Sequence, residues 1–277
     1  MNALELTGLT KHYKDFTLGP VNLTLPEGCV LGLIGENGAG KSTTIRLILD
    51  MLRPDGGSIT ILSHDSRALA REDVGVVLDE VGISECLSPR QVGNIMGNIY
   101  KNWDGAVYEG YLRSFDLPEK KRFKEFSRGM KMKLGIAVAL SHRPKLLILD
   151  EATSGLDPVA RDEVVDLFSE FTRNEEHSIL ISSHIVSDLE KLCDYIAFLH
   201  KGKLLLCEEK DRLKEEYGIL RCGAEELRNI DPAAVIGKKE SPYGVEAIVK
   251  RTAVPQGFEL GPVDIEELFV LMAKGAK

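Results

Sequence analysis

Several kinds of residue pattern are missing from this sequence, and each absence excludes a class of protein. Its 5 cysteines, at positions 29, 86, 193, 207 and 222, include no pair with the spacing of a zinc site. No apolar run is long enough to span a bilayer, and the N-terminus lacks the basic-then-apolar layout of a secretory leader. These absences lead us to expect a cytoplasmic protein that keeps its thiols reduced.

Basic residues are also fewer than acidic residues. The chain has 35 Lys and Arg against 43 Asp and Glu, which gives a net charge of −8 and argues against a general nucleic-acid binder. There is no internal repeat and no low-complexity segment. The 277 residues are 43% hydrophobic and 28% charged, so they suit one large soluble domain with an appendage, or two domains.

The clearest positive signal is a glycine-rich loop. The stretch GENGAGKST fits the pattern G-x-x-x-x-G-K-[ST] and follows CVLGLI, an apolar run with the length of a buried strand. Glycines let successive backbone N–H groups point at one phosphate cluster, and the helix that follows adds the positive end of its dipole. The lysine can reach the β- and γ-phosphates, and the serine hydroxyl can ligate Mg²⁺. The predicted nucleotide-binding residues are Gly35, Glu36, Asn37, Gly38, Ala39, Gly40, Lys41, Ser42 and Thr43, with Lys41 also catalytic and Ser42 also a metal ligand.

Apolar strands alternate with amphipathic helices through most of the chain. This alternation predicts an α/β fold around a mostly parallel sheet. Together with the glycine-rich loop, the pattern resembles the core of a P-loop NTPase. Half-buried strand patterns in residues 3–25 predict an N-terminal antiparallel β subdomain. Residues 88–142 read as an inserted helical subdomain, in which the basic residues at 120–124 are interpreted as a solvated face. We expect residues 1–207 to form this main domain and residues 208–277 to form a small C-terminal α+β domain.

Two carboxylates follow the buried strand pattern LLIL. A carboxylate at the carboxyl end of a parallel strand lies at the ligand-binding edge of the sheet, so Asp150 and Glu151 are expected beside the glycine-rich loop. Asp150 is a candidate Mg²⁺ ligand, directly or through water, and Glu151 is a candidate general base that polarises the attacking water. His184 ends the next strand at the same edge, where it can hydrogen-bond a γ-phosphate oxygen or that water.

The order and spacing of these motifs resemble the nucleotide-binding subunit of an ATP-binding cassette (ABC) transporter. Residues 126–130, FSRGM, resemble the family signature usually written LSGGQ, and KMKLGIAVAL continues it as the expected helix. Residues 147–151 resemble the second nucleotide motif with its catalytic Glu, and SGLD at 154–157 resembles the loop that crosses between paired subunits. His184 resembles the family's switch histidine. Tyr13 falls where the family has an aromatic ring that stacks on adenine.

The resemblance implies an activity and partners. In the family, two chains sandwich two ATP molecules, and the signature of one chain closes on the γ-phosphate held by the other. Ser127 and Gly129, at the start of a helix, match that anion site, and Asp157 ends the crossing loop. The implied cofactors are ATP and Mg²⁺. The implied partners are a second nucleotide-binding subunit, identical or closely related, and a multi-span membrane permease, with no nucleic acid.

Within the family, the chain is most similar to the ATPase subunits of bacterial drug, antibiotic-peptide and lantibiotic exporters. The features behind this similarity are the separate cytoplasmic chain, the helical block with YKNWD, an acidic residue in place of the family's usual Gln, and the short C-terminal domain. The implied function is ATP hydrolysis that powers an exporter from the inner face of the cell membrane. The permease is expected to dock in a groove around residues 80–91. Three roles stay open for the C-terminal domain: pairing of the chains, regulation, or padding of the core.

The sequence departs from the family pattern at three places, one of which, Ala152 in place of a frequent Pro, is expected to matter little. In the signature, Phe126, Arg128 and Met130 replace the commonest Leu, Gly and Gln. The family usually has a Gln that touches Mg²⁺ after the strand that ends near residue 78, where this chain has Asp79 and Glu80. We expect Glu80 to take that place as a metal ligand, with Asp79 as the alternative.

Two other functions remain as hypotheses. A soluble ABC protein could act on a macromolecular complex in translation or DNA repair, but the single cassette, the acidic pI and the absence of a heptad run disfavour it. A regulatory module with a degraded ATPase is disfavoured by the complete set of phosphate-loop and catalytic residues. A phosphate-release assay on the purified chain separates this second alternative from an active ATPase.

Overall fold

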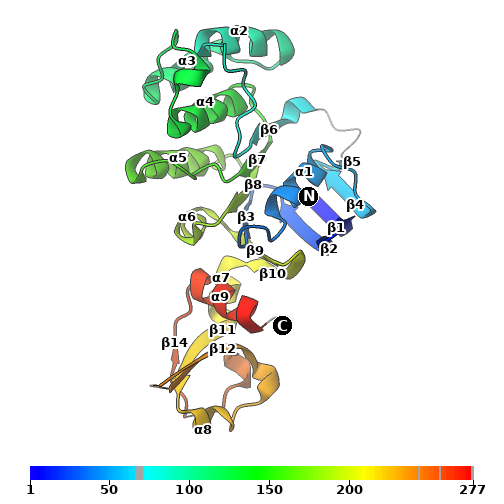
Figure 1. The fold of residues 1–277 in the computed structure, drawn as a ribbon, viewed down its shortest axis with the longest axis vertical. Helices are drawn as coiled ribbons and strands as arrows, with labels where there is room; N and C mark the ends of the chain where they lie inside the picture. The colour runs from blue at the N-terminus through cyan, green and yellow to red at the C-terminus, as the bar shows by residue number, and fades with distance from the viewer. Residues whose placement is uncertain (66–70, 243, 256, 276–277) are drawn as a thin grey trace.

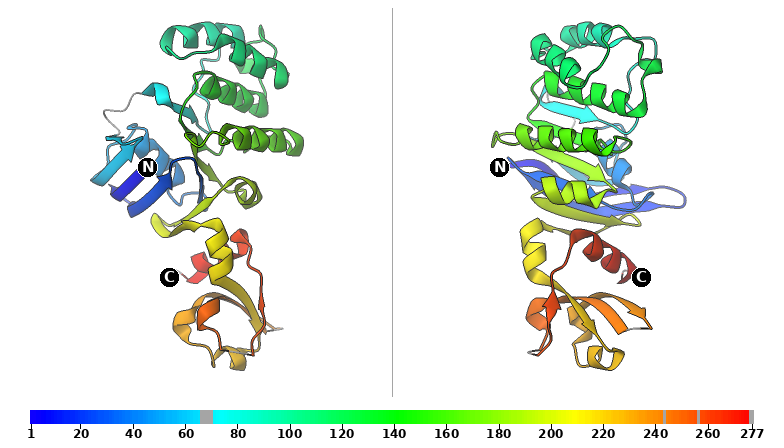
Figure 2. Two further views of the ribbon diagram at one scale, coloured as in Figure 1. Left: turned by 180° about the vertical axis from the view of Figure 1, so that it is seen from behind. Right: turned by 90° about the vertical axis from the view of Figure 1, so that its left-hand side faces the viewer.

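The computed structural model describes residues 1–65, 71–242, 244–255 and 257–275, which form an elongated molecule (Figure 1). A helical block lies at one end, an α/β core lies in the middle, and the C-terminal residues form a third body at the other end. Two further views show the same order along the long axis (Figure 2). The expected fold class is confirmed in each of its parts.

The core is built on a 6-stranded sheet with the order β10-β9-β3-β8-β7-β6. All neighbouring strands of this sheet are parallel except β10, which turns back antiparallel to β9. The carboxyl ends of β3, β7 and β8 therefore meet at one edge, where the predicted site residues follow them. The strands are β3 (Val30–Ile34), β6 (Val74–Val77), β7 (Leu146–Asp150), β8 (Ser178–Ser183), β9 (Tyr195–His200) and β10 (Lys203–Glu209).

Both faces of this sheet are covered, which explains why its strands read as continuous apolar runs. In β7, Leu147 and Leu149 pack into a cluster with helices α4 (Arg128–Ser141), α5 (Pro158–Phe171) and α6 (Val186–Leu192). The alternate residues Leu146 and Ile148 pack into a second cluster with helix α1 (Lys41–Ile48) and the N-terminal strands. Figure 1 shows these two groups of elements on opposite sides of the sheet.

The N-terminal subdomain is an antiparallel sheet with the order β2-β1-β4-β5. The helical block contains α2, α3 and α4. Polar residues cap the starts of α2, through Ser88 with Gln91, and of α3, through Asp104. The new elements are β1 (Asn2–His12), β2 (Thr17–Pro26), β4 (Gly56–Ile61), β5 (His64–Asp65), α2 (Pro89–Ile99) and α3 (Gly105–Ser114), with 3-10 turns at Arg71–Asp73 and Phe123–Glu125.

The C-terminal body is a 4-stranded sheet, β12-β13-β11-β14, with helices beside it. Strand β10 continues past the expected boundary at 207/208, and the hydrophobic cluster of the core runs on into this body. The ring of Phe269 lies 5.3 Å from that of Phe198 on β9. The elements are α7 (Lys210–Glu216), β11 (Tyr217–Cys222), α8 (Ala224–Leu227), β12 (Val235–Ser241), β13 (Gly244–Lys250), β14 (Leu260–Gly261) and α9 (Ile265–Gly275), with 3-10 turns at Pro232–Ala234 and Arg251–Ala253.

Candidate active site

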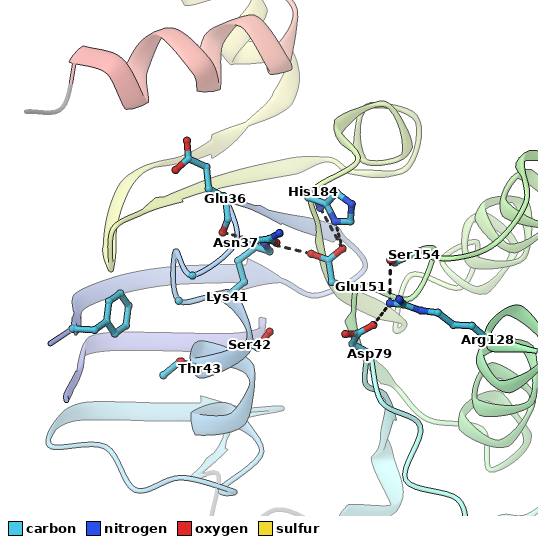
Figure 3. Close-up of a pocket in the computed structure, with 13 residues that line it drawn as sticks. Glu36, Asn37, Lys41, Ser42, Thr43, Asp79, Arg128, Glu151, Ser154 and His184 are labelled. Carbon is cyan, nitrogen blue, oxygen red and sulfur yellow. Dashed lines mark hydrogen bonds and ion pairs between the residues drawn. The ribbon is translucent and has the colours of Figure 1, made fainter. Parts of the chain in front are cut away.

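A cavity of about 440 Å³ lies where the glycine-rich loop meets the ends of β7 and β8 (Figure 3). It brings together residues from the loop, from both strand ends and from the start of α4. Nine of the predicted site residues line it: Glu36, Asn37, Gly38, Gly40, Lys41, Ser42, Thr43, Glu151 and His184.

The glycine-rich loop holds its shape through glycines in a left-handed backbone conformation. Gly38 has φ = 81° and Gly40 has φ = 111°, and a Cβ atom at Gly40 would lie 2.8 Å from the side chain of Leu18. Helix α1 begins at the next residue, and no side chain caps its N-terminus. The first N–H groups of α1 are therefore available to an anion, as a phosphate site requires.

Lys41 is buried at the base of the cavity, with 6% of its side chain exposed. Its ammonium group donates to the Gly35 carbonyl at 2.6 Å and lies 3.4 Å from one carboxylate oxygen of Glu151. A longer contact of 3.5 Å reaches the Glu36 carbonyl. Lys41, at the start of α1, thus contacts both its own loop and Glu151 at the end of β7.

Glu151 contacts both Lys41, which follows the glycine-rich loop, and His184, which follows β8. One carboxylate oxygen faces Lys41, and the other lies 2.6 Å from Nδ1 of His184. Its backbone has φ = 54°, and its N–H donates to the Ser182 carbonyl at 3.1 Å. These contacts aim the carboxylate into the cavity, and Figure 3 shows Lys41, Glu151 and His184 in one connected row.

Asp150 is not among the residues that line the cavity. It is 5% exposed and accepts a hydrogen bond of 2.5 Å from the Ser182 hydroxyl. Ser42 lines the cavity, whereas Glu80 is exposed and Asp79 takes the lining position beside it. The roles of Ser42, Asp150 and Glu80 as metal ligands stay predictions. No group of three His, Cys, Asp or Glu side chains that could hold a metal exists among the described residues, but Mg²⁺ bound with phosphates needs only one or two carboxylates.

The signature and the crossing loop are helix starts, as expected. The Ser127 hydroxyl caps α4 by accepting from the Met130 N–H at 3.3 Å. The Asp157 carboxylate caps α5 by accepting from the N–H groups of Val159 and Ala160, and the Ala160 bond is the main reason why its pKa is lowered. Ser127, Gly129 and Asp157 lie outside the cavity lining, as do Gly35 and Ala39 within the loop.

Three residues that the sequence did not place in the site also line the cavity, namely Phe16, Arg128 and Ser154, together with Asp79. Phe16 stands in the lining where Tyr13 was predicted to stack. The Tyr13 ring is 6.3 Å from that of Phe16, and Tyr13 is 44% exposed. An aromatic at the end of a short polar turn was the only available signal for Phe16. Asp79 was the stated alternative to Glu80.

No helix in the described part of the chain has the length and apolar character of a membrane span. The sequence model of the family described as "ABC transporter" matches residues 18–154. Bacitracin transport ATP-binding protein BcrA of Bacillus licheniformis is 36% identical, covering 76% of this chain and 71% of its own length. ABC transporter ATP-binding protein YtrB of Bacillus subtilis (strain 168) is 32% identical over 99% of each chain. A solved ATP-binding subunit of an ABC transporter superposes with a TM-score of 0.68 at 30% identity, covering 76% of this chain and 92% of that one.

Proposed function

Because this chain belongs to the ABC transporter family of ATP-binding proteins, we propose that it binds and hydrolyses ATP to power a membrane exporter. The observation that carries the proposal is the row formed by Lys41, Glu151 and His184 beside the uncapped start of α1. A phosphate at that helix start meets N–H groups and a buried ammonium group on one side. On the other side it meets a carboxylate that can accept a proton from water.

The residues present fit a nucleoside triphosphate with Mg²⁺. The loop supplies backbone donors, and Lys41 supplies a cation that has to exchange Glu151 for phosphate oxygens. Ser42 and Asp150 are the proposed metal-side residues, together with an acid from the 79–80 pair. These residues would hold Mg²⁺ beside the phosphates, where the ion would supply positive charge to the phosphate oxygens. Phe16, which lines the cavity, offers a flat ring for the base, and the Tyr13 ring lies 6.3 Å from it.

Hydrolysis requires a base that is ionised and aimed at the water. Glu151 accepts the proton, and His184, at 2.6 Å from its carboxylate, orients that carboxylate and contributes a hydrogen bond near the γ-phosphate. Lys41 holds the β- and γ-phosphates in line. Each of these roles uses a side chain that the cavity already brings together.

The proposal includes two partners. Ser127, Gly129 and Asp157 lie outside the cavity of their own chain, so they are free to face the nucleotide of a second ATP-binding subunit. The permease is proposed to dock at residues 80–91, where Val81 and Ile83 are partly buried against the core cluster and flanked by exposed residues. Docking there would place the chain at the inner face of the membrane.

The export direction and the substrate class rest on the relatives. BcrA is named for bacitracin transport, and a lantibiotic transport ATP-binding protein, SrtF of Streptococcus pyogenes, is 36% identical over 75% of this chain. We therefore propose a peptide antibiotic or a similar amphiphile as the cargo of the associated permease. The names of these relatives give no support to a role in translation or DNA repair.

The decisive experiment measures phosphate release by the purified chain with and without Mg²⁺. We expect Mg²⁺-dependent release by the wild type, loss of release in Lys41→Ala, and normal release in Lys191→Ala. Lys191 is a matched control because it forms an exposed surface ion pair with Asp162 at 2.9 Å. Equal turnover by the wild type and Lys41→Ala would refute the site.

The partner proposal needs a separate test. A tagged chain recovered from detergent-solubilised membranes is expected to bring a hydrophobic multi-span protein with it. Ile83→Glu should abolish this recovery while leaving nucleotide binding intact. A complex that survives Ile83→Glu, or a ribosomal or DNA-associated partner in its place, would contradict the proposed docking.

A further inference from the structure

Two places where the sequence departs from the family pattern are bound to each other in the structure. The signature carries Arg128 where Gly is commonest, and an acid stands where Gln is usual after β6. The structure turns Asp79, rather than Glu80, toward the cavity. The Arg128 guanidinium binds the Asp79 carboxylate at 2.5 Å. The two departures are therefore one structural feature.

This pair connects three segments at the rim of the cavity. Asp79 follows β6, Arg128 is the first residue of α4, and Ser154 lies in the loop after β7. Arg128 also contacts the Ser154 hydroxyl at 3.3 Å, and Figure 3 shows both bonds meeting at the guanidinium group. A Cβ atom at Gly155 would lie 2.8 Å from the Arg128 stem, so the loop packs closely on that side chain. Arg128 is thus held in place from two sides while its charge faces Asp79.

The pair is also accessible. The side chains of Arg128 and Asp79 are 59% and 48% exposed, respectively, so water competes with their bond and its net contribution to stability is small. Separating the two charges therefore costs little free energy. The pair lines the same cavity as Lys41 and Ser42, within the site proposed for the nucleotide and its metal.

We propose that Arg128 and Asp79 form an exchangeable pair that sets how strongly nucleotide binding depends on Mg²⁺. In the free protein Arg128 neutralises Asp79, which would otherwise repel the triphosphate. When Mg²⁺ enters with the nucleotide, the Asp79 carboxylate turns toward the cation, directly or through water, and Arg128 is released from it. Arg128 is a positioning residue in this scheme, because it acts through Asp79. The inference rests on the proposed nucleotide site.

Because the two residues carry opposite charges, the proposal predicts that replacing one or the other shifts the Mg²⁺ dependence of binding in opposite directions. The measured quantity is the dissociation constant of a fluorescent ATP analogue in EDTA divided by that in Mg²⁺. Arg128→Ala leaves Asp79 as an uncompensated carboxylate, so binding weakens in EDTA and the ratio rises. Asp79→Asn frees the cation and removes the metal-side carboxylate, so the ratio falls. An exposed pair is worth about 0.2–1 kcal/mol, which corresponds to changes of up to about fivefold in each direction.

Two further variants complete the design. Arg128→Lys keeps the charge and should stay close to the wild-type ratio. Arg143→Ala breaks a comparable ion pair with Asp104 at 2.6 Å, outside the cavity lining, and should leave the ratio unchanged. Because the Arg128 pair is exposed, its variants are expected to melt like the wild type, and the thermal melt of each is recorded beside the titration.

The outcomes are separable. Shifts of opposite sign in Arg128→Ala and Asp79→Asn, with rescue by Arg128→Lys, support the exchangeable pair. Unchanged ratios, or shifts of the same sign, overturn it while leaving the nucleotide site in place. Failure of the wild type to bind the analogue at all would overturn the proposed function and this inference together.

Discussion

Replacing Glu151 with Gln should slow hydrolysis and tighten ATP binding at the same time. The carboxylate has two contacts in the free protein, with the Lys41 ammonium group at 3.4 Å and with His184 at 2.6 Å. Gln has nearly the same shape, so it fills the same space, but it cannot act as a base or form an ion pair. The two effects come from different states of the protein, and they can be measured separately.

The expected loss of turnover follows from the role of Glu151 as general base. Positioned acid–base groups contribute about 10²–10⁴-fold to rates, so phosphate release should fall by that order. The gain in binding comes from Lys41. Two charges 3.4 Å apart attract by about 5 kcal/mol at an effective dielectric constant of 20. Most of this is offset by desolvation, which leaves about 1–2 kcal/mol that the nucleotide no longer has to overcome.

The assay pairs single-turnover phosphate release with equilibrium titration of a fluorescent ATP analogue. We expect release to be nearly abolished and the dissociation constant to fall by about tenfold, since 1.4 kcal/mol corresponds to a factor of ten. The control is Glu163→Gln, which removes a carboxylate paired with Lys133 at 3.5 Å on the outer side of α5. Normal turnover in Glu151→Gln would refute the base. Weaker ATP binding would refute the competition for Lys41.

Three other changes test separate parts of the structure. Phe16→Ala should weaken ATP binding by about 1–3 kcal/mol, more than Tyr13→Ala, because Phe16 lines the cavity; a loss confined to Tyr13→Ala in the same titration would restore Tyr13 as the stacking ring. Phe269→Ala should lower the free energy of unfolding in urea by about 3–5 kcal/mol, since it empties a space beside Phe198, and a change below 1 kcal/mol would contradict that packing. Burial lowers the pKa of His142 below its ordinary 6.5, so the unfolded chain takes up a proton first and stability is lost as pH falls below about 6.5. His142→Phe should therefore flatten the fall in melting temperature between pH 7 and pH 5, and an unchanged slope would exclude this contribution.

The glycine-rich loop and the residues that end β7 and β8 could be predicted because their chemistry is local. A glycine pattern between a buried strand and a helix dictates its own backbone, and a parallel sheet places its strand ends at one edge. Glu151 and His184 follow neighbouring strands in this sheet, so their contact with each other, and that of Glu151 with Lys41, follow from topology.

Which of Asp79 and Glu80 faces the cavity could not be predicted from the sequence. Strand β6 ends at Val77, and the two-residue alternation that decides which side chain faces inward ends with it. Which of the two acids reaches the cavity then depends on Arg128, a residue remote in sequence. Phe16 is a similar case. The Tyr13 N–H donates to the Phe16 carbonyl at 2.8 Å, and the shape of this turn decides which ring faces the cavity.

Strand β12 of the C-terminal body was missed because little in its sequence specifies a strand. Strand β12 reads VIGKKES, with a glycine and four largely exposed residues at its end, so it lacks both alternation and an apolar run. Its conformation comes from pairing with β13, which has the buried residues that β12 lacks. Tertiary pairing outweighs local preference there.

Strand β9 connects the C-terminal body to the phosphate loop of the candidate active site. Phe198 packs against Phe269 of α9, and two residues after the strand ends the Gly202 N–H donates to the Ala39 carbonyl of the phosphate loop at 2.9 Å. A chain cut after residue 207 would therefore uncover the apolar flank of the strand that supports this loop. Nucleotide bound by the loop and apolar contacts made by α9 would therefore stabilise the same strand. Occupancy of the cavity should accordingly be readable as slower hydrogen exchange in a helix that never touches the ligand.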